Sequence, residues 1–241
     1  MTHETILLVP CFNPLKNWEV QFYERYQEFI SIAGKQIPVV LINDGSSQSL
    51  EQEVAWLQNR IKENFYYLEL TSNLGKGGAL KAGAGYIDSE YYIFTDIDFP
   101  YTAKSMAELL SLLLSEKGLI PGNREKEYYQ DMNTFRSIIS RLLRSLNYRL
   151  LKLPVNDTQC GLKGFDKNAR EILLQCSTNR FLIDLEWLLA AHHAGIAIKP
   201  SKVQLREGLQ LTSFNPAILG KEIFSFLKIL WKYRVLHSKK N

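Results

Sequence analysis

The stretch VVLINDGSS at residues 39–47 combines the two features that decide the fold. Four consecutive apolar residues are typical of a strand buried on both faces, and Asn-Asp-Gly-Ser-Ser is typical of the turn that ends such a strand. The same form recurs as ILLVPCFN at residues 6–13, as FYYLEL before a glycine-rich turn at residues 65–78, and as YYIFTDID at residues 91–98. The sequence therefore predicts four strands that deliver polar or glycine-rich residues at their carboxyl ends.

Apolar side chains at helical spacing separate these strands, over residues 18–30, 54–61 and 79–87. This alternation predicts an α/β fold, a Rossmann-like and mainly parallel sheet with helices on both faces. In such a sheet, ligands bind outside the carboxyl ends of the strands. Further helices are expected over residues 184–194 and 217–236. We expect one domain over residues 1–212 and an amphipathic helical extension over residues 213–241.

Composition excludes several classes of protein. Apolar residues make up 46% and charged residues 22% of the 241 residues, which is a globular balance. The net charge of +4 is too small to indicate nucleic acid as a partner. The three cysteines are too scattered for a disulfide framework or a zinc knuckle. Without a recognisable leader or a bilayer-spanning apolar run, we expect a cytoplasmic protein, with peripheral contact to the cytoplasmic face of a membrane as an additional possibility.

Asp96-Ile97-Asp98 directly follows a predicted buried strand. Side chains at i and i+2 of an extended segment point the same way, so the two carboxylates can face one cation. Oxygen ligands suit Mg²⁺ or Mn²⁺, whose coordination is usually completed by substrate phosphates. The alternative is a strand-end turn with solvated acids.

A glycine-rich turn, Asn73-Leu74-Gly75-Lys76-Gly77-Gly78, precedes a predicted helix. Bare backbone at a helix N-terminus favours a phosphate group, and a tight strand-to-helix turn is the alternative. Asp44 ends the second strand, where its carboxylate can accept hydrogen bonds from a base or a ribose. Alternatively, Asp44 or Ser46 caps the next helix.

Seven short motifs occur in an order that resembles the family 2 inverting glycosyltransferases with the GT-A fold. The likeness is greatest to the polyprenyl-phosphate, or dolichyl-phosphate, mannosyl- and glucosyltransferases, and it covers roughly residues 5–210. The motifs are VPCFN at 9–13, INDGSS at 42–47, NLGKGGAL at 73–80, TDID at 95–98, GNR at 122–124, DTQCGLKGF at 157–165 and DLE at 184–186.

The resemblance implies a role for each motif. The nucleoside of a nucleotide-sugar would be bound by Pro10, Phe12, Asn13 and Asp44. The nucleotide and its diphosphate would lie beside Lys76, Gly78, Asp96, Ile97 and Arg206. Arg206 could instead form a surface salt bridge. Asp96 and Asp98 would hold the divalent cation. Catalysis would involve Asp98, Asp184 and Glu186. Asp184 and Glu186 could each serve as a base, as a substrate ligand or as a charge at the N-terminus of a helix.

The second half of the chain bears on the acceptor. A hydroxyl acceptor needs a general base, for which Asp157, Asp184 and Glu186 are candidates, whereas an anionic phosphate acceptor needs cationic positioning. By resemblance, the acceptor phosphate would be bound by Arg124, Arg136, Ser140 and Gln159. Leucine and arginine alternate over residues 133–153, and a second amphipathic stretch with Trp231 and Tyr233 lies near the C-terminus. Both fit a membrane interface, or else they pack on the sheet or in a dimer.

These observations lead to one functional expectation and its alternatives. We expect a metal-dependent inverting transfer of a hexose from a UDP- or GDP-linked donor to a polyprenyl or dolichyl phosphate, by a single displacement. The same donor site could serve a sugar hydroxyl in a cell-surface glycan, and a non-catalytic nucleotide-sugar or membrane-binding module is a further alternative. Nucleotidyl transfer, which would release pyrophosphate, is a fourth.

Overall fold

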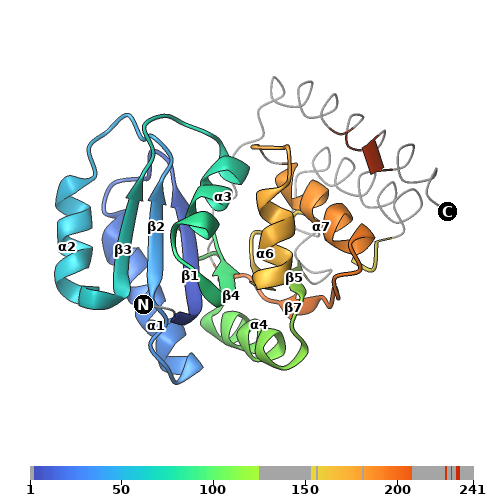
Figure 1. Ribbon diagram of the computed structural model, residues 1–241. Helices are drawn as coiled ribbons and strands as arrows, with labels where there is room; N and C mark the ends of the chain where they lie inside the picture. The colour runs from blue at the N-terminus through green and yellow to red at the C-terminus, as the bar shows by residue number, and fades with distance from the viewer. Residues whose placement is uncertain are drawn as a thin grey trace.

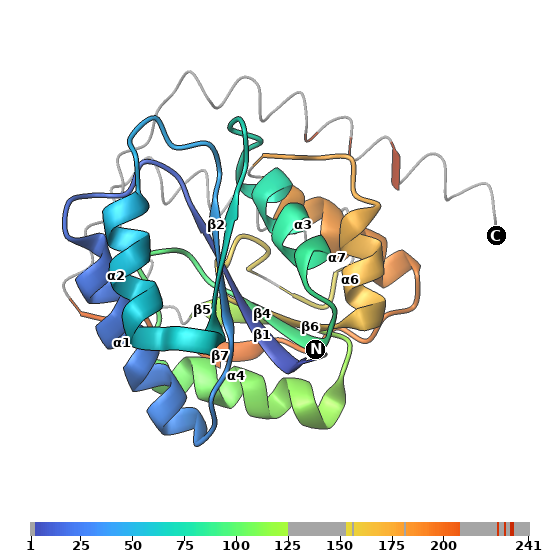
Figure 2. The same cartoon turned by 60° about the vertical axis from the view of Figure 1, so that its left-hand side comes forward.

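The computed structural model describes residues 3–124, 153–155, 157–180 and 182–207, together with Phe226, Ile229, Lys232 and Tyr233. Within these residues a sheet lies between two layers of helices (Figures 1 and 2). The strands are β1 His3–Cys11, β2 Val39–Asn43, β3 Phe65–Glu69, β4 Ser89–Phe94, β5 Leu119–Arg124, β6 Lys163–Asp166 and β7 Ser201–Val203. The helices are α1 Trp18–Ala33, α2 Glu51–Ile61, α3 Lys76–Tyr86, α4 Ala103–Glu116, α6 Lys167–Leu174 and α7 Ile183–His193, and Lys62–Asn64 forms a 3₁₀ turn.

The sheet has the order β3-β2-β1-β4-β6-β5-β7. Strands β1 to β4 pair in parallel, whereas β6 is antiparallel to both β4 and β5. Because β6 runs in the opposite direction, its first residue, Lys163, pairs with Phe94 at the carboxyl end of β4. The segment that precedes β6 therefore reaches the same edge of the sheet as the carboxyl ends of the parallel strands.

Two hydrophobic clusters cover the two faces of the sheet. Alternate residues of β1 divide between them: Leu7 and Val9 pack with α1, α2 and α4, while Ile6 and Leu8 pack with α3, α6 and α7. This division explains why β1 is a continuous apolar run, since both of its faces are covered. The described part of the C-terminal segment joins the second cluster, in which Ile229 and Tyr233 are buried.

The predicted α/β architecture with a mainly parallel sheet is confirmed, and the boundaries of its elements differ in detail. Helix α3 begins at Lys76 rather than Ala79, because Gly75 at its N-cap takes a φ of 84° that ends the preceding loop. Strand β3 ends at Glu69 rather than Leu70. The stretch over residues 133–152 and most of residues 208–241 lie outside the described residues, so the division at residue 212 stays a prediction. In the described part of the chain, no helix is long and apolar enough to cross a bilayer.

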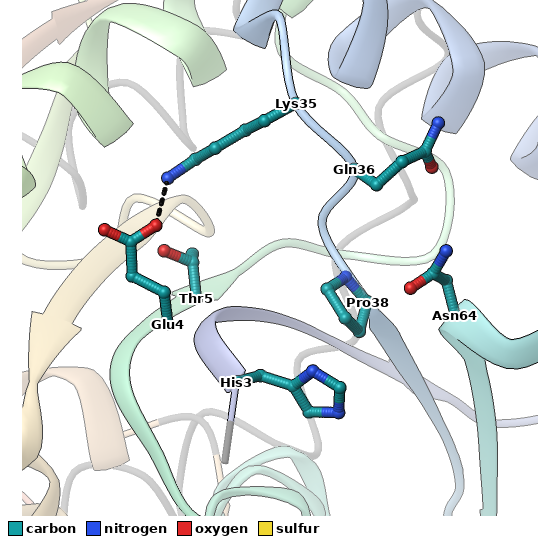
Figure 3. A pocket seen from close by; sticks show the side chains of 7 residues that line it. All are labelled: His3, Glu4, Thr5, Lys35, Gln36, Pro38 and Asn64. Carbon is teal, nitrogen blue, oxygen red and sulfur yellow. Dashed lines mark hydrogen bonds and ion pairs between the residues drawn. The ribbon is translucent and has the colours of Figure 1, made fainter. Parts of the chain in front are cut away.

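A hollow at the amino ends of β1 and β2 lies at the opposite edge of the sheet from the predicted site (Figure 3). It is lined by His3, Glu4, Thr5, Lys35, Gln36, Pro38 and Asn64. Lys35 Nζ lies 2.8 Å from Glu4 Oε2 there, and both side chains are substantially exposed. None of the predicted site residues lines this hollow.

Candidate active site

The carboxyl ends of β1 and β2 are joined by hydrogen bonds. The Asn13 side-chain oxygen accepts hydrogen bonds from the Ser47 amide at 2.8 Å and the Ser47 hydroxyl at 3.0 Å. The backbone amide of Asn13 donates a hydrogen bond to Ser46 Oγ at 2.9 Å. Pro10 is half-buried at the end of β1, and the Phe12 side chain beside it is 50% exposed. The two loops therefore form one surface that presents an aromatic ring to solvent.

Asp44 holds the glycine-rich turn. Its carboxylate accepts hydrogen bonds from the Leu74 amide at 2.7 Å, the Gly75 amide at 2.9 Å and the Asn73 side-chain amide at 3.0 Å. Asp44 is buried, and it is Asn43 Oδ1 that accepts from the Ser46 amide at 3.0 Å. The Asp44 side chain thus organises the next loop, and its predicted contact with a nucleoside stays a prediction.

The glycines at the start of α3 allow close packing against the segment that leads into α7. A Cβ atom on Gly77 would lie 2.7 Å from Ile183 Cβ, and one on Gly75 would lie 2.7 Å from the Asn179 carbonyl oxygen. The Gly78 amide donates to that same carbonyl at 3.1 Å. The turn therefore has a clear packing role. A phosphate contact at Gly78 stays a prediction, and it must share an amide that already has a partner.

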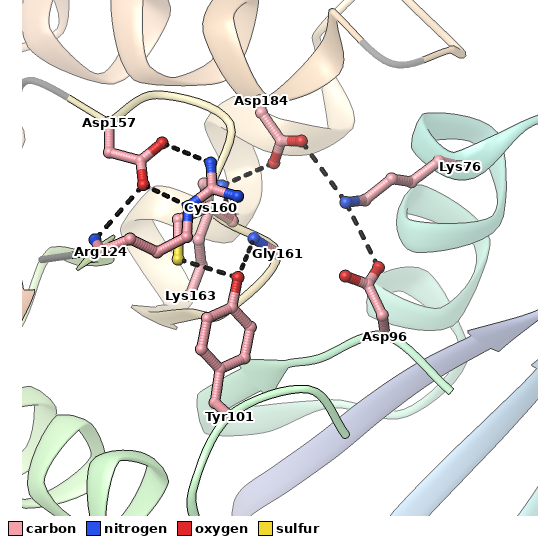
Figure 4. A network of polar contacts seen from close by, with 9 residues as sticks. All are labelled: Lys76, Asp96, Tyr101, Arg124, Asp157, Cys160, Gly161, Lys163 and Asp184. Atoms are coloured by element: carbon pink, nitrogen blue, oxygen red, sulfur yellow. Dashed lines mark hydrogen bonds and ion pairs between the residues drawn. The ribbon is translucent and has the colours of Figure 1, made fainter. Parts of the chain in front are cut away.

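A partly buried network of ion pairs links α3, α7, β6 and the end of β4 (Figure 4). Lys76 Nζ lies 3.4 Å from Asp96 Oδ1 and 3.6 Å from Asp184 Oδ2, and Lys163 Nζ lies 2.7 Å from Asp184 Oδ1. Lys163 is fully buried and Asp184 almost so. Burial alone would lower the pKa of Lys76, but the charges of Asp184 and Asp96 raise it, so Lys76 stays a cation. The predicted residues Lys76, Asp96 and Asp184 are thus brought together.

Two arginines hold the turn that carries Asp96 and Asp98 by hydrogen bonds to its backbone carbonyls. Arg206 Nε donates to the carbonyls of Phe99 at 3.2 Å and Tyr101 at 3.1 Å, and Arg25 donates to the Asp98 carbonyl. Phe99 takes a φ of 41° while its ring is fully buried, and such a backbone persists only where the surroundings impose it. The guanidinium of Arg206 also pairs with Glu28 at 2.7 Å. Arg206 therefore supports the turn, while its predicted contact with the diphosphate stays a prediction.

Asp96 and Asp98 fit a divalent cation that binds together with substrate phosphates. Asp96 is half-buried beside Lys76, Asp98 is exposed, and Ile97 between them packs against the first hydrophobic cluster. Among the described residues, no group of three or more His, Cys, Asp or Glu side chains could hold a metal. A pair of carboxylates suits Mg²⁺ or Mn²⁺. These cations commonly bind one or two protein carboxylates and complete their coordination shell with phosphate and water.

Arg124 at the end of β5 and Asp157 form a two-point ion pair. Arg124 Nε lies 2.6 Å from Asp157 Oδ2, and Nη2 lies 2.8 Å from Oδ1. Burial would raise the pKa of Asp157, but the bonds from Arg124 hold it below its usual value. Gln159 is exposed two residues further along the chain. Arg136 and Ser140, the other predicted acceptor residues, lie outside the described residues.

Glu186 has a different set of partners from Asp184. Its carboxylate accepts hydrogen bonds from the Ser177 hydroxyl at 2.9 Å and the Thr178 amide at 2.7 Å, and it pairs with Lys232 Nζ at 2.8 Å. The side chain is fully buried. Burial would raise its pKa, but the bonds from Lys232, Thr178 and Ser177 lower it to about 2. Its contacts are those of a positioning residue, and its predicted catalytic role stays a prediction.

The sequence assigns no functional role to four residues of this network: Tyr101, Cys160, Gly161 and Lys163. Lys163 is the buried partner of Asp184, and the Tyr101 hydroxyl accepts hydrogen bonds from the Gly161 amide at 2.9 Å and the Cys160 thiol at 3.2 Å. A Cβ atom on Gly161 would overlap with Asp96 Oδ2. The one available signal was the position of Gly161 and Lys163 inside a motif of the family that the chain resembles.

Comparison with known proteins agrees with this geometry. The model of glycosyl transferase family 2 matches residues 7–173, which is more than half of the chain. The chain belongs to glycosyl transferase family 2. A dolichyl-phosphate beta-glucosyltransferase from Dictyostelium discoideum is 27% identical over 213 residues, which are 81% of this chain and 65% of that protein. The chain thus spans less than two thirds of that relative's length.

Solved structures show the same fold at low identity. Glucosyl-3-phosphoglycerate synthase from Mycobacterium tuberculosis, in complex with uridine diphosphate, matches 96% of this chain and 80% of its own, with a TM-score of 0.68 and 14% identity. A mannosyltransferase from Pyrobaculum calidifontis, in complex with GDP-Man and Mn²⁺, matches 83% of this chain and 56% of its own, with a TM-score of 0.57 and 14% identity. The expected GT-A-like fold is confirmed by these likenesses.

Proposed function

We propose that this chain is a metal-dependent inverting glycosyltransferase that moves a hexose from a UDP- or GDP-linked donor to a polyprenyl phosphate. The observation that carries the proposal is the convergence of Asp96, Lys76 and Asp184 at the carboxyl end of β4, in a chain of glycosyl transferase family 2. The similarity to a dolichyl-phosphate glucosyltransferase supports the acceptor class.

The donor would lie across the loops that follow β1, β2 and β4. Phe12 offers an exposed ring for a base, and Pro10, Asn13 and Asp44 complete that surface. Asp96 and Asp98 would hold Mg²⁺ or Mn²⁺, which when bound offsets the charge that develops on the departing nucleoside diphosphate. The backbone clamp from Arg206 and Arg25 fixes the turn on which both carboxylates lie.

The ion pairs favour a phosphate acceptor over a hydroxyl. A general base for a hydroxyl works best with a pKa near the operating pH. The three base candidates are each held against a cation instead: Asp157 against Arg124, Asp184 against Lys163, and Glu186 against Lys232. For Asp157 and Glu186 the bonds from these cations lower the pKa, which makes each of these two carboxylates a weaker base. A phosphate monoester is already an anion and needs no base, so cationic groups near Arg124 would suffice to position it.

A transfer assay with paired acceptors tests the proposal. Purified protein with Mn²⁺ is offered UDP-glucose or GDP-mannose, with either polyprenyl phosphate or the matching polyprenol. We expect a glycosylated lipid with one donor and the phosphate alone, and its loss in Asp96→Asn, which keeps the side-chain size. Transfer to polyprenol or to a sugar hydroxyl, with none to polyprenyl phosphate, would contradict it. Binding of a donor without transfer or hydrolysis would favour a non-catalytic module.

A further inference from the structure

The Lys76 ammonium lies between the carboxylates of Asp96 and Asp184. Its ammonium lies 3.4 Å from Asp96 and 3.6 Å from Asp184, and 4.9 Å from the centre of the Phe94 ring. It comes from the first residue of α3, whose start is fixed by Gly75 and by the packing of Gly77 against Ile183. The lysine is therefore aimed at Asp96 by the fold.

The two lysines of the network differ in how firmly they are held. Lys163 is completely buried and lies 2.7 Å from Asp184, whereas the Lys76 side chain is 19% exposed and both of its ion-pair distances are longer. Asp96 is 39% exposed, so it can be reached from solvent. Lys163 thus keeps Asp184 paired even when Lys76 leaves, while Asp96 has Lys76 as its ion-pair partner in the described part of the chain.

We propose that Lys76 is a built-in competitor of the divalent cation for Asp96, which makes cation binding depend on the donor. This inference rests on the proposed function. A divalent cation on Asp96 Oδ1 would lie within a few ångströms of the Lys76 ammonium and would be repelled by it, so Lys76 must move away for the cation to bind tightly. An anionic diphosphate gives the released ammonium a new partner. Cation and nucleotide therefore bind cooperatively, and the cation alone binds weakly.

Titration with Mn²⁺, followed by the loss of its free-ion paramagnetic resonance signal, tests the inference without catalysis. In the absence of nucleotide, we expect Lys76→Met to bind Mn²⁺ about tenfold more tightly than the wild type, because a competing charge a few ångströms away is removed. Lys76→Arg, which keeps the charge, is expected to bind Mn²⁺ like the wild type. Lys35→Met removes the ion pair with Glu4 at the far edge of the sheet and is the matched control.

The same titration with saturating UDP or GDP measures the coupling. The wild type is expected to bind Mn²⁺ more tightly with one of these nucleotides than without, and this gain is expected to shrink in Lys76→Met, since its carboxylate is already free.

Two results would overturn the inference, and they are distinguishable. Unchanged or weaker Mn²⁺ binding to folded Lys76→Met, while the wild type binds Mn²⁺ with nucleotide, removes the competitor role and leaves the proposed function intact. A wild type that binds no Mn²⁺ with either nucleotide removes both the inference and the metal dependence in the proposed function. Should Lys76→Met fail to fold, Lys76→Gln replaces it, and unchanged or weaker Mn²⁺ binding to folded Lys76→Gln would likewise overturn the inference.

Discussion

Gly161 shows how closely the loop before β6 approaches the strand-end carboxylates. Any side chain at this position would overlap with Asp96 Oδ2. We expect Gly161→Ala to move Asp96 and to lower kcat/KM by about 100-fold, since displacements of about 1 Å cost that much in a positioned site. The stabilisation of the fold by nucleotide with Mn²⁺ should weaken in parallel, as read from the melting temperature.

Gly85→Ala provides the matched control for this change. Gly85 is exposed in α3, and a Cβ atom there would meet nothing within 4 Å. Alanine in a helix is favoured over glycine by about 1 kcal/mol, so this variant should melt slightly higher and keep its nucleotide response. Equal activity of the Gly161 and Gly85 variants would contradict the placement of Asp96.

Lys163 contributes to the stability of the folded protein as well as to the site. It is fully buried, and its ammonium pairs with Asp184 Oδ1. We expect Lys163→Met to lower the free energy of unfolding by about 3 kcal/mol, because the buried Asp184 carboxylate loses its short contact and keeps only the longer one, to Lys76 at 3.6 Å. Denaturant titration measures this loss. The double variant Lys163→Met with Asp184→Leu should recover most of the stability and none of the transfer activity.

At the scale of elements, Glu186 joins α7 to two other segments. It binds Ser177 and Thr178 in the loop after α6, and Lys232 in the C-terminal segment. The next residue of that loop is Asn179. Its backbone carbonyl accepts a hydrogen bond from the Gly78 amide of α3, and its side-chain oxygen accepts one from Lys81 Nζ at 2.6 Å. A continuous set of contacts therefore runs from the C-terminal segment to the start of α3, where Lys76 lies.

Glu186→Gln should make stability less sensitive to acid. Burial alone would raise the pKa of Glu186, but the bonds from Lys232, Thr178 and Ser177 lower it from 4.5 to about 2. Because the folded-state pKa is depressed, this stabilisation is complete above about pH 4.5 and is lost as the pH falls toward 2. We expect the variant to lose about 2 kcal/mol of unfolding free energy at pH 7 and to show a shallower decline below pH 4.5.

Glu63→Gln is the control for that titration. Glu63 is exposed in the 3₁₀ turn, so its replacement should change the unfolding free energy by less than about 0.5 kcal/mol. An acid decline of the same steepness in the Glu186 variant and the wild type would contradict the role given to Glu186.

The sequence predicted those strands that consist of a short run of consecutive apolar residues. The runs at residues 6–9, 39–42 and 92–94 are buried in the parallel strands β1, β2 and β4, as predicted. Strand β6 was missed because four residues, two of them Lys163 and Asp166, carry no apolar alternation. Its antiparallel direction depends on pairing with β4 and β5, which local sequence does not encode.

At the scale of the whole molecule, the site depends on contacts between distant parts of the chain. The pairs of Arg124 with Asp157 and of Lys76 with Asp184 join residues whose sequence separation hides them from any local pattern. The sequence motifs predicted which residues gather at the strand ends, and the family match confirms the class of protein. The cations that pair with the three candidate bases emerged only from the folded chain, and they support the phosphate acceptor that the sequence already favoured.

The chemical structure of the transfer product distinguishes an inverting transfer to a phosphate from the other reactions. The lipid formed from the α-linked donor and polyprenyl phosphate is isolated, and the one-bond C1–H1 coupling of its sugar is measured by nuclear magnetic resonance, together with the coupling of C1 to phosphorus. We expect a β-linked sugar attached through the phosphate. An α-linked sugar would contradict the single inverting displacement, and a sugar without coupling to phosphorus would contradict the phosphate acceptor.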